Sequence, residues 1–247
     1  MEKQIEKAAA AIKHASHGTV FTGAGVSVES NIPPFRGENG LWSRYNPEVL
    51  DLSFFYNNPY ESWQVIKEIF YDFFGKAEPN QAHYAIASLE EKGLIHAVIT
   101  QNIDNLHQEA GSNTVFEFHG NSRTLQCVSC KQKYEATKVN LDVIPPRCEK
   151  CHGLLKPDFI FFGEGIPGEA YSNSLREAEM ADVFIVVGTT GEVMPASMIP
   201  HNAKQNGSTI IEVNPEISYY TNSITDIYLR GKAGEVIPQI VHAINKI

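Results

Sequence analysis

The four cysteines of this chain have the spacing of a metal site. They form two Cys-x-x-Cys pairs, Cys127 with Cys130 and Cys148 with Cys151, and seventeen residues separate the pairs. Two such pairs can supply four thiolates to a tetrahedral Zn²⁺ ion, and four cysteine ligands leave no position open for a reacting water. The spacing therefore predicts one structural zinc ion that holds a small module together.

Three other uses of these cysteines are open at this point. Two disulfides would need an oxidising compartment, but the N-terminal residues have neither the apolar region nor the cleavage site of a secretory signal. A redox Cys-x-x-Cys motif normally occurs singly. Cys148 to His152 spells the attachment motif of a c-type haem, which would leave Cys127 and Cys130 without a role. Zinc is the interpretation that uses all four residues.

A short glycine-rich loop follows the first apolar run of the chain. Thr19 to Thr22 leads into Gly23-Ala24-Gly25, and glycines there would let the backbone approach a pyrophosphate. The usual dinucleotide fingerprint has a third glycine where this chain has Val28, and the acidic residue expected about 20 positions later has no clear counterpart. The loop alone fits a plain strand–turn–helix as well as it fits a dinucleotide site.

The sequence around this loop resembles the nucleotide-binding signature of the sirtuins, the NAD-dependent protein lysine deacylases. The similar stretch runs from Gly23 to Gly37 and reads GAGVSVESNIPPFRG. Other motifs of the family follow in its order around the cysteine pairs: Thr100-Gln101-Asn102-Ile103-Asp104, Phe118-His119-Gly120, Phe162-Gly163-Glu164, Gly188-Thr189-Thr190 and Asn214-Pro215-Glu216. On these motifs the chain is identified as a member of the sirtuin family over its full length.

The resemblance implies an NAD-dependent protein lysine deacetylase that acts on acyl-lysine peptides and proteins. In the family's reaction the acyl oxygen attacks C1′ of the nicotinamide ribose, nicotinamide leaves, and an alkylimidate forms. His119 would be the general base that activates the ribose 2′-hydroxyl, since an imidazole titrates near neutral pH. Water then releases free lysine and 2′-O-acetyl-ADP-ribose. Zinc would take no part in these steps.

The resemblance also assigns the other site residues. Asn102 and Asp104 join His119 in the catalytic set, and both would point to the same side of extended backbone after a strand. The residues expected to contact NAD are Gly23, Ala24, Gly25, Ser27, Phe35, Arg36, Gln101, Asn102, Ile103, Asp104, Gly188, Thr189, Thr190, Asn214 and Ala233. The residues expected to hold the substrate peptide as an added strand are Phe162, Gly163, Glu164, Val193 and Met194. His107 and His152 are given no role.

Two departures from the family pattern bear on the activity. Asn31 replaces a glycine, which is a mild change because Asn tolerates a positive φ. Pro34 replaces an acidic residue and removes a backbone N–H, so it stiffens the segment over the cofactor.

The Tyr-x-x-Arg pair by which desuccinylases of this family bind an acyl carboxylate is also missing. Lys67 to Phe70 stands in that neighbourhood, and no arginine lies between Arg44 and Arg123. Since an unpaired carboxylate in an apolar tunnel is costly, we expect a neutral acyl group such as acetyl.

Two alternative functions remain open. The same reactive ribose could meet a different nucleophile, which would make the protein a mono-ADP-ribosyltransferase or an NAD hydrolase. The motifs that would clamp a peptide favour the deacetylase. The chain could instead be a non-catalytic NAD-sensing protein, an interpretation that the retained His119, Asn102 and Asp104 oppose.

The elements that must position these residues predict an α/β fold. Short β-branched runs at 19–22, 97–100, 183–187, 209–213 and 226–229 alternate with helical patterns at 2–16, 81–93, 169–181 and 234–246. This alternation is typical of a doubly wound, Rossmann-like parallel sheet. Two segments break it, 36–80, which is helical and aromatic, and 121–157, which holds the cysteines. We therefore expect a single sirtuin-type catalytic domain over 1–247. Its Rossmann-like lobe would comprise about 1–35, 81–120 and 158–247, and the two inserts would form a smaller zinc-binding, helical lobe.

The bulk composition excludes some classes of protein. The chain has 247 residues, 43% of them hydrophobic, and no apolar run long enough to cross a membrane. A net charge of −9 argues against nucleic-acid binding and favours basic partners such as lysine-rich peptides. We expect a cytoplasmic monomer.

Overall fold

A six-stranded parallel sheet forms the centre of the larger lobe. The computed structural model describes residues 1–36 and 40–247, so Gly37 of the nucleotide-binding signature lies outside the described residues. The strands follow the order β3-β2-β1-β7-β8-β9, and every neighbouring pair is parallel. Their bounds are β1 Gly18–Thr22, β2 Ala97–Thr100, β3 Val115–Glu117, β7 Val183–Val187, β8 Thr209–Asn214 and β9 Ile227–Arg230. The Rossmann-like parallel sheet predicted from the sequence is confirmed.

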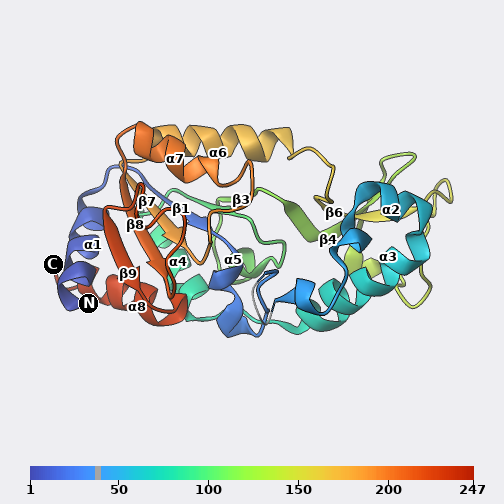
Figure 1. Ribbon diagram of the computed structural model, residues 1–247, viewed down its shortest axis with the longest axis horizontal. Coiled ribbons are helices and arrows are strands. Elements are labelled where there is room, and N and C mark those ends of the chain that lie inside the picture. The colour runs from blue at the N-terminus through green and yellow to red at the C-terminus, as the bar shows by residue number, and fades with distance from the viewer. Residues whose placement is uncertain (37–39) are drawn as a thin grey trace.

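Helices cover both faces of this sheet (Figure 1). One face carries α1 (Glu2–His14), α4 (Gln81–Glu91) and α8 (Ala233–Ile244). The other carries α6 (Gly168–Met180) and α7 (Met198–Gln205). Alternate side chains of each strand feed the two layers. In β1, for example, Val20 packs into the cluster with α1, α4 and α8, while Phe21 packs into the cluster with α6 and α7. Burial on both faces explains the uninterrupted apolar runs of these strands.

A second, antiparallel sheet belongs to the smaller lobe at the right of Figure 1. Its order is β5-β4-β6, with bounds β4 Gly120–Cys127, β5 Lys133–Glu135 and β6 Leu155–Phe159. Beside it lie α2 (Leu52–Asn57), α3 (Pro59–Ile66) and a π-helical segment, Lys67–Phe73. The short α5 (Leu106–Glu109) packs against α4 of the larger lobe. Trp63 donates its indole N–H to the Leu155 carbonyl at 2.9 Å. Both inserts therefore share one hydrophobic core.

Several elements differ from the sequence-based expectation. The strands β3, β4, β5 and β6 and the helix α7 were not predicted, and strand β9 begins one residue later than expected. The lobe boundaries stay a prediction, and β6 crosses the one placed at 158. In the part of the chain that is described, no helix is long and apolar enough to span a bilayer. The cytoplasmic location and the monomeric state also stay predictions.

Candidate active site and zinc centre

Two glycine loops meet at the carboxyl ends of β1 and β7. Gly23 N–H donates to the Val187 carbonyl at 3.0 Å, and Gly25 N–H donates to the Gly188 carbonyl at 2.8 Å. A Cβ on Gly25 would lie 2.6 Å from the Gly188 Cα, so only glycine allows this approach. Gly188 itself has φ +62°. In the sheet, β1 lies between β2 and β7. The chain continues from β1 to β2 on one side, and β7 to β9 extend the sheet on the other side, so the strand order reverses at β1. Such a topological switch point is where α/β sheets bind ligands.

Polar side chains from three neighbouring loops are joined beside these glycines. The Gln101 side-chain amide donates to Thr189 Oγ1 at 3.1 Å, and the Asn214 amide donates to the Thr189 carbonyl at 3.0 Å. Gly231 N–H donates to the Asn214 carbonyl, which links this group to the start of α8, where Ala233 is buried. Thr190 is exposed, and its carbonyl accepts from Tyr219 N–H. The predicted NAD-contacting residues at the ends of β2, β7 and β8 thus lie together along the carboxyl ends of these strands.

Ser27, Asn102 and Asp104 form a second, more buried group. Ser27 Oγ donates to Asp104 Oδ2 at 2.7 Å, and the Asn102 amide donates to both Ser27 Oγ (3.1 Å) and Asp104 Oδ2 (3.2 Å). Burial raises the pKa of Asp104, although the hydrogen bonds from Ser27, Leu106 N–H and Asn102 act in the opposite direction. Ile103 between them is buried and packs into the core of the small lobe.

His119 lies next to this group, at the start of the small lobe's sheet. Its Nδ1 is 2.9 Å from the Gln101 carbonyl oxygen, and because a carbonyl only accepts, Nδ1 carries the hydrogen. Nε2 is then the basic nitrogen. Burial lowers the pKa of His119 below that of an ordinary imidazole, and the bond to Gln101 counteracts the shift in part. A neutral, half-buried imidazole with one oriented N–H has the form of a general base.

Two further histidines support the site: His83, which was not predicted, and His107, for which no role was expected. His83 Nδ1 accepts from Asn80 N–H at 3.2 Å, which leaves the hydrogen on Nε2, 3.4 Å from Ser27 Oγ. His107 Nε2 lies 3.0 Å from Thr22 Oγ1, at the end of β1. Burial lowers the pKa of His83 to about 4 and the pKa of His107 well below its usual value. Both rings are therefore neutral structural groups. The Asn80-x-x-His83 capping box was the available signal for His83.

In the segment expected to bind the peptide, the main-chain N–H and carbonyl of Phe162 already form hydrogen bonds. Phe162 N–H donates to the Leu50 carbonyl at 2.8 Å, and Leu52 N–H donates to the Phe162 carbonyl at 3.0 Å. The Phe162 side chain is exposed, and Gly163 has φ +89° with open space where a Cβ would stand. On the other segment Met194 is 65% exposed, while the Val193 carbonyl accepts from Ser197 N–H. Any added strand must therefore use main-chain groups other than those of Phe162.

The segment that departs from the family pattern folds onto the small lobe. Asn31 has φ +65°, the conformation expected for it. The carbonyls of Pro34 and Phe35 accept from Leu41 and Trp42 N–H groups, at 2.9 and 3.1 Å, and the Phe35 and Trp42 rings lie 5.5 Å apart. Arg36 is exposed and lines a cavity of about 600 Å³ together with Trp42 and Phe162. Phe35 and Arg36 are thus on the side of the peptide segment.

The four cysteines are brought together as predicted. Their sulfurs all lie within 4.8 Å of one another, with Cys127 and Cys151 at 3.5 Å and Cys130 and Cys148 at 3.6 Å. Zinc–sulfur bonds of about 2.3 Å place tetrahedral thiolates about 3.8 Å apart, so one Zn²⁺ fits. The Tyr134 hydroxyl lies 3.1 Å from Cys148 Sγ and would orient that ligand.

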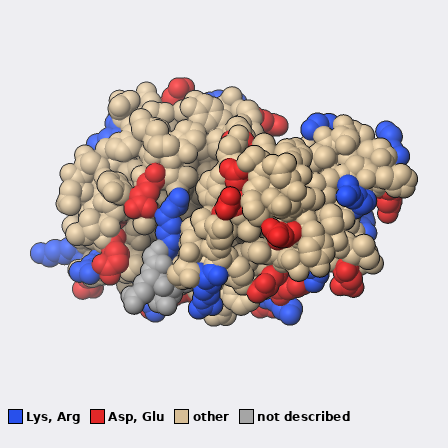
Figure 2. Space-filling model, turned by 45° about the vertical axis from the view of Figure 1, so that its right-hand side comes forward, with Lys and Arg blue, Asp and Glu red and all other residues tan. Residues whose placement is uncertain are grey.

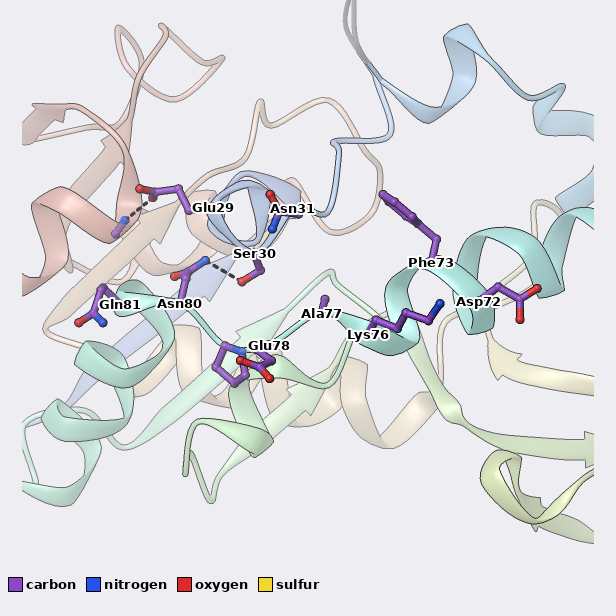
Figure 3. Close-up of a pocket in the computed structure, with 12 residues that line it drawn as sticks. Glu29, Ser30, Asn31, Asp72, Phe73, Lys76, Ala77, Glu78, Asn80 and Gln81 are labelled. Atoms are coloured by element: carbon purple, nitrogen blue, oxygen red, sulfur yellow. Dashed lines mark hydrogen bonds between the residues drawn. The ribbon is translucent and has the colours of Figure 1, made fainter.

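A cavity of about 720 Å³ lies between the loop that follows Gly25 and the segment that leads from the helical insert into α4 (Figure 3). Glu29, Ser30 and Asn31 of this loop line one side, and the end of the helical insert, with Phe73 and Lys76, lines another. Figure 3 shows the Asn80 amide pointing at Ser30, to which it donates at 3.0 Å. None of the described residues that line this cavity is among the residues predicted to bind NAD or peptide, although Ser30 and Asn31 belong to the nucleotide-binding stretch.

Comparison with known proteins gives one consistent result. The model of the Sir2 family matches residues 23–195. The chain is 43% identical to an NAD-dependent protein deacylase of Pyrococcus abyssi, covering 98% of this chain and 99% of the relative. It is 44% identical to NAD-dependent protein deacylase 2 of Archaeoglobus fulgidus, covering 100% and 98%.

Solved structures agree with these relatives. A Sir2 homologue in complex with NAD superposes with a TM-score of 0.90 at 42% identity, covering 98% of this chain and 94% of that one. A Sir2 protein bound to a deacetylated p53 peptide and 3′-O-acetyl ADP-ribose superposes with a TM-score of 0.91 at 35% identity, covering 96% and 97%.

Proposed function

Because the chain belongs to the Sir2 family, we propose that it removes acyl groups from protein lysines in an NAD-dependent reaction and that acetyl is its preferred acyl group. Acetyl-lysine, NAD⁺ and water would give free lysine, nicotinamide and O-acetyl-ADP-ribose. Archaeal relatives over nearly the whole chain are named deacylases, and one of Pyrobaculum aerophilum is named a deacetylase.

The observation that carries the proposal is the orientation of His119. Its N–H is committed to the Gln101 carbonyl, so the unprotonated Nε2 is the atom available to take a proton from a ribose hydroxyl. Gln101 begins the loop that also supplies Asn102 and Asp104. The base is therefore hydrogen-bonded to the loop that carries the polar residues, and both can act on one bound ribose.

The glycine loops fit an NAD cofactor. The approach of Gly25 to Gly188 leaves no room for side chains, which suits a backbone that must contact a pyrophosphate. Ser27, Asn102 and Asp104 would orient the nicotinamide half, and Asn214 would contact the adenosine half. NAD supplies the electrophilic ribose carbon, while the chain contributes binding, exclusion of water and the base.

The test is a paired assay on the purified, zinc-loaded protein with NAD⁺ and an acetyl-lysine peptide. We expect nicotinamide release and loss of the acetyl mass to occur together, only with NAD⁺, and to drop at least about 100-fold in His119→Ala. His242→Ala, which changes an exposed histidine on α8, is the matched control and should leave the rate unchanged. Nicotinamide release without deacetylation would favour ADP-ribosyl transfer or NAD hydrolysis instead.

A preference for a neutral acyl group is supported by the segment that replaces the Tyr-x-x-Arg pair. Ile69 and Phe70 are buried in the core of the small lobe, and Lys67 forms an ion pair with Asp72 at 2.8 Å. These residues offer no spare cation to a carboxylate on the acyl chain. We expect kcat/KM for an acetyl-lysine peptide to exceed that for the matching succinyl-lysine peptide by at least about tenfold. Faster turnover of the succinyl peptide would refute this preference.

A further inference from the structure

A half-buried ion pair lies directly beneath the peptide-binding segment. Lys156 comes from β6, and Glu164 follows Phe162 and Gly163 in the chain. Lys156 Nζ lies 2.9 Å from Glu164 Oε2, and the two side chains are only 13% and 22% exposed. We propose that Lys156 is a positioning residue for the substrate peptide, which acts through Glu164 to hold the main chain of residues 161–164. This inference rests on the proposed function, because it concerns the peptide site of that reaction.

Every hydrogen of the Lys156 ammonium has a partner, either at the end of β6 or in the turn that follows it. Nζ donates to the Pro157 carbonyl at 2.8 Å, to the Phe159 carbonyl at 2.8 Å, and to Glu164. It also lies 4.1 Å from the centre of the Phe161 ring. An ammonium has three hydrogens, so this lysine is fully used inside the protein and has none left for a ligand. Its role is therefore structural and local.

Glu164 closes the turn from the other end. Its Oε2 accepts from Phe161 N–H at 2.7 Å, and its own N–H donates to the Phe161 carbonyl at 3.0 Å. The turn 161–164 is thus closed by its own main chain and side chain, with the lysine ammonium below it. Gly163, with φ +89°, and Phe162 are the exposed residues of this turn. The main-chain groups there keep one geometry only while the pair is intact.

The residues just before this turn are hydrogen-bonded to the main chain at His119. Ile160 N–H donates to the His119 carbonyl at 2.8 Å, and Phe159 pairs with Gly120. On its other side Phe162 bonds to Leu50 and Leu52. The segment is therefore fixed at 159–160 and at 162, and the ion pair fixes the turn that continues beyond. An acyl-lysine must reach His119 from a peptide laid on this turn, so a loosened turn would weaken peptide binding and alignment.

Another lysine on the same sheet offers a matched control. Lys133 of β5 forms an ion pair with Asp158 of β6 at 2.7 Å, but its side chain is 58% exposed and its partner precedes the turn. Lys156→Met and Lys133→Met make the same chemical change, and each removes one ion pair from β6. Only the first pair reaches the peptide segment. A difference between these two variants thus separates positioning from general loss of charge.

The experiment measures KM for an acetyl-lysine peptide, KM for NAD⁺ and kcat in the zinc-loaded full chain, with melting temperature and zinc content alongside. Fluorescence anisotropy of a labelled acetyl-lysine peptide gives binding without turnover. We expect Lys156→Met to raise the peptide KM and Kd by ~10-fold with the KM for NAD⁺ and the zinc content unchanged. Lys156→Arg should recover most of the affinity, and Lys133→Met should match the wild type. Glu164→Gln, which keeps the shape of the side chain, should weaken peptide binding in the same direction and replaces Lys156→Met if that variant fails to fold.

The outcomes separate this inference from the proposed function. An unchanged peptide Kd in Lys156→Met or Glu164→Gln overturns the positioning role, and so does an equal loss in Lys133→Met or an equal rise in the KM for NAD⁺. If the wild type shows no NAD-dependent deacetylation, the proposed function fails. The anisotropy measurements still decide the role of Lys156 in that case.

Discussion

At the residue scale, the proposed chemistry depends on keeping His119 neutral. Burial removes water from its imidazole, which disfavours the charged form and lowers the pKa of His119 below 6.5. The hydrogen bond to Gln101 fixes the tautomer, because that carbonyl can only accept. A base with a depressed pKa is weaker, but at neutral pH a larger fraction of it is unprotonated than of an ordinary imidazole. Asp104, which is bonded to Ser27 and Asn102, has the opposite shift, a pKa that desolvation raises.

This shift predicts the pH dependence of the reaction. Protonating His119 abolishes the base, and since burial lowers its pKa in the folded enzyme, the acid limb of kcat/KM should be centred at a lower pH than the titration of an ordinary imidazole. Above this limb the profile should be flat to about pH 8. The measurement is kcat/KM against pH, limited to conditions in which the enzyme recovers full activity on return to neutral pH. An acid limb centred at about pH 7 or above would contradict the burial argument.

At the scale of elements, the helical insert and the zinc sheet hold one another in place. Tyr71 of the π-helical segment donates its hydroxyl to the Ser122 carbonyl in β4, at 3.1 Å. Trp63 of α3 makes the equivalent bond to Leu155 in β6. Because β4 begins directly after His119 and β6 leads into the peptide segment, the packing of the insert reaches both parts of the site. The zinc ion would fix the far end of the same sheet.

Removing one of these bonds should weaken the lobe measurably. Tyr71→Phe leaves the Ser122 carbonyl without its buried donor, and we expect the free energy of unfolding to fall by about 1–3 kcal/mol. Tyr60→Phe deletes the same hydroxyl from an exposed tyrosine of α3 and should stay within about 0.5 kcal/mol of the wild type. Urea denaturation with zinc in excess measures both. Equal stability of the two variants would mean that this bond does not hold the insert.

The elements also show where sequence reasoning works and where it stops. Strands β1, β2, β7 and β8 were predictable because they are buried on both faces and form continuous apolar runs. Strand β3 is a three-residue, half-buried edge strand, β5 is a three-residue strand that pairs only with the end of β4, and β6 pairs with β4 across the cysteine-containing segment. His83 and Lys156 escaped notice because their roles come from partners far along the chain or across a turn. The spacing of the cysteines needed no such context.

At the scale of the whole molecule, charge is spread rather than concentrated. On the face drawn in Figure 2, acidic and basic side chains alternate without a large patch of one sign among the described residues. The net charge is nevertheless −9. Near the peptide segment, Glu48 and Asp51 line the cavity beside Phe162, where Arg36 is the single cation among the described lining residues, and Glu192 is exposed beside Val193. The molecule should therefore attract basic peptides at long range and discriminate among them only moderately.

Salt dependence tests this expectation. An attraction between a chain of −9 and a lysine-rich acetyl peptide is screened over about 10 Å at about 0.1 M salt, so kcat/KM should fall about three- to tenfold from low salt to about 0.5 M. The matched peptide, in which glutamines replace the flanking lysines, should show a nearly flat response. The KM for NAD⁺, measured at saturating peptide, controls for general effects of salt on the enzyme. Equal salt dependence of the two peptides would show that the flanking lysines add no long-range attraction, and that the acyl-lysine and the main chain of the substrate are what the protein recognises.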